Sequence, residues 1–144
     1  MRRWGPVAIV IFLIDQICKY FAVQRLPEEG GRLHSLIAFV LHKNFGIAFD
    51  LPVPSWIVIP LTLIIIIAAS TALWRHRANA HVSTALIFIV LGGLGNLIDR
   101  LVYGYTVDYI ILFTRSAINL SDLMILGGVI GFMCTTRVDK KLIS

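Results

Sequence analysis

The sequence predicts an integral membrane protein that is mainly α-helical, with four transmembrane helices and a small extracytoplasmic β element. Its 144 residues are 58% hydrophobic and only 15% charged, and the mean hydropathy is +0.84. Such a composition excludes an ordinary soluble domain. A helix needs about 20 apolar residues to cross a bilayer, and four stretches approach that length. Because four spans and their loops use up the chain, we expect one membrane domain over residues 1–144.

The first expected helix covers residues 4–26 and holds two charged residues inside its apolar run. Asp15 and Lys19 are four residues apart, which places them on the same face of a helix, where each can partly neutralise the other. Two interpretations stay open. The pair either fixes the packing of this helix, or it faces the bundle interior and supports a polar site, because unpaired charge inside a membrane is rare.

The first loop outside the membrane is expected at residues 27–53, where short apolar and polar runs replace the long apolar stretch. Its β-branched and aromatic residues predict two short strands. The turn between them contains Asn44 and Gly46, which are common turn-forming residues. Two histidines of this loop, His34 and His42, lack a matching pattern of carboxylates or thiolates, so we predict no metal site.

The remaining helices are expected at residues 54–74, 81–98 and 120–136. The second helix has no ionisable residue, which is typical of a wall that faces lipid. The third and fourth are rich in glycine, and small residues let membrane helices approach closely. Gly127 and Gly131 have the four-residue spacing of such contacts. We therefore expect the end of the third helix to lie beside the start of the fourth.

The distribution of basic residues predicts the orientation of the chain in the membrane. Seven of the 13 Lys and Arg residues cluster at three sites on one side of a four-helix arrangement: Arg2, Arg3, Arg75, Arg77, Arg137, Lys140 and Lys141. An excess of Lys and Arg marks the cytoplasmic side. Both termini are therefore expected in the cytoplasm, and the loops at 27–53 and 99–117 outside.

Two acids near the last loop are candidates for chemistry. Asp122 follows Asn119 and Ser121, either of which can cap the fourth helix, and plain capping is one interpretation of Asp122 itself. Asp108 instead lies in the apolar segment YTVDYIIL, where an acid resists ionisation. If the two carboxylates meet, one can act as a base toward water and the other as an acid toward a peptide carbonyl. The sequence lacks the HExxH and GxSxG patterns of other hydrolases.

A non-enzymatic interpretation stays beside this one. A small transporter or assembly subunit could use its intramembrane acids to bind a cation or a partner helix. It accounts equally well for Asp15 and Lys19, but not for the acids at the outer ends of the third and fourth helices.

Five ordered blocks of the chain resemble the bacterial lipoprotein signal peptidases, also called signal peptidase II. The blocks are DQICK from Asp15, NFGIAF from Asn44, GGLGNLIDR from Gly92, GYTVDYI from Gly104 and NLSD from Asn119. The resemblance implies an aspartic endopeptidase of the bacterial inner membrane, active at its outer face and without a cofactor. Its substrates would be diacylglyceryl-modified prolipoproteins, cut just before the lipidated cysteine. The partners implied are these substrates and membrane lipids, with no nucleic acid.

The resemblance also assigns roles by position. Asp108 and Asp122 occupy the positions of the catalytic pair. The positions that bind substrate or support the site are Asn44, Gly46, Asn96, Arg100, Asn119, Asp15, Lys19 and Asp99, the last of which is more structural than catalytic.

The chain also departs from the family pattern. Ser121 stands where alanine is usual, Ile118 replaces a usual phenylalanine, and the connection from Asp108 to Asp122 is shorter. We expect these differences to change the outer rim of the site more than its chemistry. A family member that binds lipoproteins without cutting them is a third hypothesis, against which the intact pair of aspartates argues.

Overall fold

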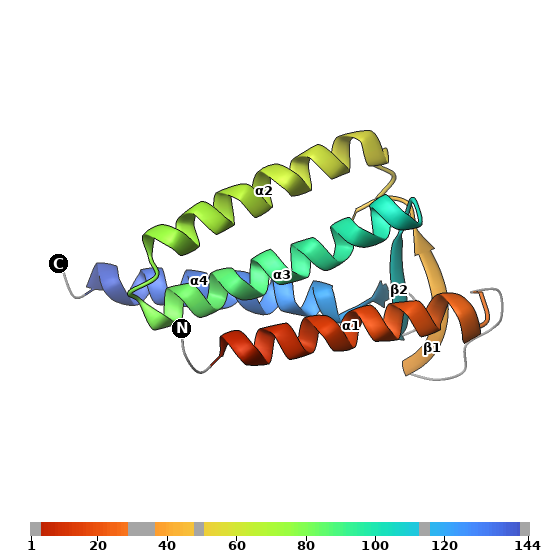
Figure 1. Ribbon diagram of the computed structural model, residues 1–144, viewed down its shortest axis with the longest axis horizontal. Coiled ribbons are helices and arrows are strands. Elements are labelled where there is room, and N and C mark those ends of the chain that lie inside the picture. The colour runs from red at the N-terminus through yellow and green to blue at the C-terminus, as the bar shows by residue number, and fades with distance from the viewer. Residues whose placement is uncertain (1–3, 29–36, 48–50, 113–115, 142–144) are drawn as a thin grey trace.

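Four helices run side by side, and a small sheet closes one end of them (Figure 1). The computed structural model describes residues 4–28, 37–47, 51–112 and 116–141. The helices are α1 (Gly5–Arg25), α2 (Ser55–Arg75), α3 (Ala80–Val102) and α4 (Leu120–Lys141). Helix α3 is central, because it contacts each of the other three helices. The start of α1 and the end of α4 both lie at the end opposite to the sheet.

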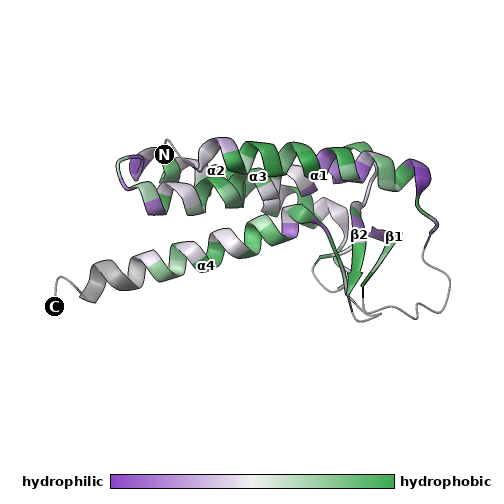
Figure 2. Cartoon of the chain, turned by 90° about the horizontal axis from the view of Figure 1, so that it is seen from below, coloured by the Kyte–Doolittle hydropathy of each residue, from purple (hydrophilic) through white to green (hydrophobic). Residues whose placement is uncertain are grey.

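Three of the four helices in the described chain have the length and composition of membrane-spanning segments. Helices α1, α2 and α3 are each long and apolar enough to cross a membrane, whereas the apolar part of α4 is the shorter stretch Leu120–Thr135. Figure 2 shows hydrophobic residues, in green, along the helices. Many large apolar side chains are exposed on them, as expected where the surrounding solvent is lipid. The predicted fold class, a mainly helical multi-pass membrane protein with a small β element, is confirmed.

Helix α3 is longer than predicted. It starts after Asn79, whose side chain accepts hydrogen bonds from two first-turn N–H groups and so caps the helix. It ends at Val102, so Asp99 and Arg100 lie in its last turns and not in a loop. The predicted end at residue 98 is wrong because no helix-breaking residue occurs there. Gly104 supplies the stop, since it has a φ of 82° that favours glycine at a helix C-terminus.

Glycines bring the backbones of α3 and α4 together. A Cβ atom on Gly92 would lie 2.5 Å from the carbonyl oxygen of Ser121, and one on Gly128 would lie 2.7 Å from that of Ala85. The predicted close approach of these helices is therefore confirmed. Of the predicted pair Gly127 and Gly131, Gly131 does face α3, since a Cβ there would lie 3.6 Å from Cβ of Ala85, whereas the contact through Gly127 is wrong, because its Cβ position has no atom beyond its own helix backbone within 4 Å. Each residue turns a helix by about 100°, so the neighbouring Gly128 faces α3 in its place.

The sheet joins the loop between α1 and α2 to the loop between α3 and α4. Strand β1 (Ile37–Asn44) pairs antiparallel with β2 (Thr106–Leu112), and β2 pairs antiparallel with β3 (Ser116–Ile118). Of the two strands predicted within residues 27–53, the first is β1, and the segment of the second, after the turn, includes residues 48–50, which lie outside the described residues. The partner of β1 comes from the loop after α3. The alternation of residues reveals a strand but not the strand with which it pairs.

The apolar face of the β1–β2 pair packs against α1. Side chains alternate between the two faces of a strand, so Val107 and Tyr109 share one face of β2. Both are buried in a cluster with Leu41 of β1 and Ala22 of α1. This packing fixes the sheet against the end of the helices.

The opposite face of the same pair is polar. Cross-strand register places His42 opposite Asp108 and Asn44 opposite Thr106. Directly opposed residues carry their side chains on the same face. The sheet therefore gathers four polar side chains beside the ends of α3 and α4.

Candidate active site

Asp122 lies in the first turn of α4, where it is part of a reciprocal cap. The backbone N–H of Asp122 donates to Oδ1 of Asn119 over 2.9 Å, and the backbone N–H of Asn119 donates to Oδ2 of Asp122 over 3.2 Å. This is the capping-box arrangement. The other carboxylate oxygen, Oδ1, accepts a hydrogen bond of 2.7 Å from Nδ2 of Asn96 on α3. Asp122 is thus held between α3 and the start of its own helix.

Asp108 is buried in the middle of the small sheet, with 1% of its surface exposed. Its Oδ1 accepts a hydrogen bond of 2.6 Å from Nδ2 of Asn119, and its Oδ2 accepts one of 3.1 Å from Nδ2 of Asn44. Burial raises the pKa of Asp108 to about 7, and the Asp122 carboxylate adds to the rise, while the two amide donors and His42 oppose it. Asp108 can therefore carry a proton near neutral pH.

Asn119 connects the two aspartates. Its backbone N–H binds Asp122, and its side-chain amide binds Asp108. A further bond of 3.3 Å runs from that amide to the carbonyl oxygen of Val107, which ties the residue to β2. The two acids proposed from the sequence are therefore brought into one polar cluster through a single shared neighbour.

Arg100 forms the side of the cluster next to the loop after β1. Its guanidinium group donates to the carbonyl oxygens of Asn96 and Gly46, over 3.3 Å and 3.0 Å. The backbone N–H of Gly46 in turn donates to Oδ1 of Asn44 over 3.0 Å. Asn44 and Gly46 thus form a turn with a defined partner on α3, so they do more than reverse the chain.

Lys19 lies at the centre of a buried charge network behind the aspartates. Its Nζ is 3.0 Å from Oδ2 of Asp15 and 2.8 Å from Oδ2 of Asp99. It also donates to Oδ1 of Asn96 over 3.0 Å. Asp99 accepts a further bond from the backbone N–H of Val107. Of the two interpretations of Asp15 and Lys19, the geometry favours support of a polar site inside the bundle.

Two hydroxyl groups belong to this network, that of Tyr109, which the sequence did not single out, and that of Ser121, for which it predicted a cap or a place at the rim. Tyr109 donates to Oδ1 of Asp15 over 3.0 Å, and Ser121 donates to Oδ2 of Asp15 over 2.6 Å. Ser121 was expected to affect the outer rim of the site, but it is fully buried beside α1. Ile118 is half-buried in β3. Their positions in the sequence could have indicated a role, because Tyr109 and Ser121 are each next to a candidate aspartate. A hydroxyl buried at such a position needs a hydrogen-bond partner.

The polar face of the sheet adds two residues without an assigned role. His42 lies opposite Asp108, and the hydroxyl of Thr106 is buried without a hydrogen-bond partner among the described residues. His34 lies outside the described residues. Within the described part of the chain, no three His, Cys, Asp or Glu side chains are arranged to hold a metal ion.

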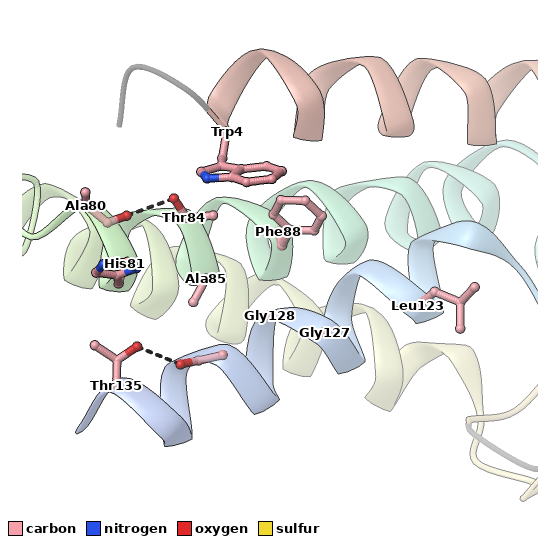
Figure 3. Close-up of a pocket in the computed structure, with 11 residues that line it drawn as sticks. Trp4, Ala80, His81, Thr84, Ala85, Phe88, Leu123, Gly127, Gly128 and Thr135 are labelled. Carbon is pink, nitrogen blue, oxygen red and sulfur yellow. Dashed lines mark hydrogen bonds between the residues drawn. The ribbon is translucent and has the colours of Figure 1, made fainter. Parts of the chain in front are cut away.

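A separate cavity of about 560 Å³ lies between α1, α3 and α4, as Figure 3 shows. Its walls include the ring of Trp4 near the start of α1, the ring of Phe88 on α3 and the backbone of Gly127 on α4. Neither aspartate lines it. The candidate site is therefore the polar cluster at the sheet and not this apolar cavity.

Comparisons with known proteins agree with the geometry. Residues 7–138 match the family model described as Signal peptidase (SPase) II. The chain is 34% identical over 144 residues to a lipoprotein signal peptidase of Syntrophomonas wolfei, which covers 98% of this chain and 96% of the relative. It is 31% identical over 139 residues to a lipoprotein signal peptidase of Streptococcus pneumoniae, and this match covers 90% of this chain and 91% of the relative.

The fold also matches a solved structure, described as a bacterial membrane enzyme at 2.3 Å resolution. The TM-score is 0.81 over 93% of this chain and 87% of that chain, with 23% sequence identity. At this identity the likeness concerns the fold. Together with the family match, it confirms the resemblance seen in the sequence blocks. The chain belongs to the signal peptidase II family.

Proposed function

We propose that the protein is an aspartic endopeptidase that removes signal peptides from diacylglyceryl-modified prolipoproteins, cutting just before the lipidated cysteine. Family membership supports the reaction class. The observation that carries the assignment of the chemistry is that Asn119 binds both Asp108 and Asp122 in a buried polar cluster. Carboxylates in such a setting suit acid–base activation of water.

The two acids have different roles in this proposal. Asp108, with a pKa raised to about 7, holds the proton and acts as the acid. Each acid accepts two hydrogen bonds, so these do not distinguish them. Only Asp122 of the two lies in the first turn of a helix, where the helix dipole stabilises an anion. Asp122 is therefore the base toward water.

Proton transfers follow from these assignments. The water oxygen attacks the scissile carbonyl carbon while Asp122 takes a proton from that water. At the same time Asp108 gives its proton to the carbonyl oxygen. The resulting gem-diol collapses when one of its hydroxyl groups returns a proton to Asp108. Asp122 then protonates the leaving nitrogen, the C–N bond breaks, and both acids regain their starting states.

Neighbouring polar groups position the substrate in this proposal. Arg100 and the amides of Asn44, Asn96 and Asn119 surround the pair. Donors fixed beside a peptide carbonyl orient it and stabilise the charge that develops on its oxygen. They therefore hold the peptide backbone while the acids act.

The position of the site suggests how the substrate arrives. The aspartates lie at the end of the bundle that the sheet closes (Figure 1). We place this end at the periplasmic or extracellular face of the bacterial inner membrane, with both termini in the cytoplasm, because the basic clusters lie at the other end of the spans. A signal helix can then enter sideways from the lipid while its acyl chains stay in the bilayer.

Cleavage of a lipidated prolipoprotein peptide by the purified protein tests the proposal. Asp108→Asn and Asp122→Asn should each leave the protein folded and abolish cleavage, because either change removes one proton-transfer step. Glu28→Gln is the matched control. It neutralises an exposed acid that pairs with Lys43 and should leave the rate unchanged. Normal cleavage by either aspartate variant would refute the dyad, and no cleavage by the wild-type protein would favour the transporter or subunit interpretation.

A further inference from the structure

Each proposed catalytic aspartate has a hydroxyl residue as its neighbour in the chain. Tyr109 follows Asp108 in β2, and Ser121 precedes Asp122 in α4. Both hydroxyls donate to the same carboxylate, that of Asp15 on α1, with Tyr109 on Oδ1 and Ser121 on Oδ2. One buried group outside the pair is therefore connected to a position one residue away from each acid.

Asp15 also holds the start of α4. The backbone N–H of Leu120 donates to its Oδ1 over 3.1 Å. This group is one of the first-turn N–H groups that have no partner within their own helix. Together with the Ser121 hydroxyl, it gives Asp15 two hydrogen bonds to the turn that contains Asp122. Hydrogen bonds to an ionised acceptor are stronger than neutral ones, so Asp15 fixes this turn relative to α1.

The same carboxylate holds the strand that contains Asp108. The ring of Tyr109 packs on the face of β2 opposite to Asp108. Its hydroxyl reaches Asp15 from there and also accepts a hydrogen bond of 3.3 Å from the backbone N–H of Leu120. A shift of β2 relative to α4 would therefore have to break either the bond from Tyr109 or the bonds from the first turn of α4.

We propose that Tyr109 and Ser121 are positioning residues, which act through Asp15 to set the placement of Asp108 relative to Asp122. This inference rests on the function proposed above. Its physical reason is that acid–base catalysis needs its groups within about 0.5 Å of the productive geometry. Asn119 bonds both acids directly, and the two hydroxyls restrain the backbone on either side of that residue.

The inference can be tested with variants that remove single hydroxyl groups. Tyr109→Phe keeps the ring that packs with Ala22 and Leu41. Ser121→Ala removes an oxygen that fits closely against α3, at Gly95, where a Cβ would clash with it. Asp15 keeps a partner in either variant, since Leu120 and Lys19 still donate to it.

Matched controls remove a hydroxyl of the same kind elsewhere. Ser83 is also fully buried, and its hydroxyl donates to the carbonyl oxygen of His76 at the other end of the bundle. Tyr103 is a half-buried tyrosine at the end of α3, outside the Asp15 network. Ser83→Ala and Tyr103→Phe should therefore leave kcat unchanged.

The measurement is kcat and KM on a lipidated prolipoprotein peptide, with thermal unfolding of the same samples. We expect each single variant to lower kcat roughly tenfold while KM stays within twofold, because misplacement affects the transition state more than binding. The double variant should lose less than the product of the two single losses, since either change already disturbs the one geometry that both hydroxyls maintain.

Three results would overturn the inference: an unchanged kcat for both single variants, a loss of rate equal to the loss of folded protein, or equal losses in the controls. If the wild-type protein cleaves the peptide and Asp108→Asn does not, these results leave the proposed function intact. If the wild-type protein cleaves nothing, the proposed function fails and the inference fails with it.

Discussion

At the scale of single residues, Asp108 and Asp122 have the same side chain but different surroundings. Asp108 lies in the middle of a strand, where burial dominates and raises its pKa to about 7. Asp122 lies at the start of a helix, where the backbone N–H of Asn119 faces it. Burial favours the neutral acid and a helix N-terminus favours the anion. This difference is the basis for assigning the proton to Asp108.

The pH dependence of cleavage follows from the raised pKa of Asp108. The proposed acid must be protonated, so its active form predominates below its pKa and is lost as the pH rises through about 7. We therefore expect the alkaline limb of the kcat/KM profile, which reports the free enzyme, near neutral pH. The pH dependence of kcat/KM for cleavage of a lipidated peptide measures this limb. A kcat/KM that stays constant to pH 9 would contradict the assignment of the proton to Asp108.

Replacement of His42 should shift the alkaline limb of the pH–rate profile. His42 lies opposite Asp108 in the register of β1 and β2, and its charge lowers the pKa of Asp108. His42→Gln removes this charge, so the pKa of Asp108 should rise and the alkaline limb should move to higher pH. Lys43→Gln is the control, because Lys43 lies on the other face of β1 and pairs with Glu28. A shift to lower pH in His42→Gln would contradict the expected sign.

At the scale of elements, the contact between α3 and α4 places Asn96 beside Asp122. It depends on positions where the two backbones nearly touch, such as Gly92 and Gly128. Between membrane helices there is little hydrophobic driving force, so close packing supplies much of the association. The geometry of the site therefore depends on residues that have no polar group of their own.

Neighbouring glycines of α4 should respond differently to alanine. In Gly128→Ala the new Cβ would lie 2.7 Å from the carbonyl oxygen of Ala85, a backbone atom that cannot move alone. We expect the free energy of unfolding to fall by about 1–3 kcal/mol, as in other overpacked contacts. Gly127→Ala meets no atom within 4 Å and improves helix propensity, so it should be neutral or stabilising. Thermal unfolding in detergent compares the two, and equal losses would contradict the assigned faces.

At the scale of the whole molecule, one buried network joins three helices and the sheet. Lys19 on α1 binds Asp99 and Asn96 on α3, and Asp15 connects it to β2 and to the start of α4. Removing one partner of a buried ion pair leaves the other charge buried without compensation, which strongly destabilises the folded protein. The network therefore couples the site to the stability of the bundle.

Lys19→Met should expose this coupling. Methionine keeps most of the side-chain volume but leaves Asp15 and Asp99 without their shared cation. We expect unfolding free energy to fall by about 3–5 kcal/mol, with a loss of cleavage because Asn96 also loses its donor. Lys43→Met, at an exposed pair, should leave stability nearly unchanged, because water screens such pairs. Denaturation experiments compare the unfolding free energies of the two variants. Equal small effects would show that the buried charges are not coupled to folding.

Local properties of the chain explain what could be predicted from the sequence. Hydropathy and length depend on residues near one another, so the membrane-spanning helices and the fold class were predictable. The glycine-rich runs correctly indicated that α3 and α4 pack closely. The predicted functional residues lie in one cluster with its buried supports, and their roles stay predictions that the variants above test.

The sequence by itself determined a membrane-spanning chain with two acids near the ends of its last helices. Tertiary structure alone decided that β1 pairs with β2, that Gly128 faces α3, and that Tyr109 and Ser121 meet at Asp15. The physical reason is distance along the chain. Hydropathy, caps and turns act over a few residues, whereas the bond from Tyr109 to Asp15 joins positions 94 residues apart and exists only once α1, β2 and α4 have packed.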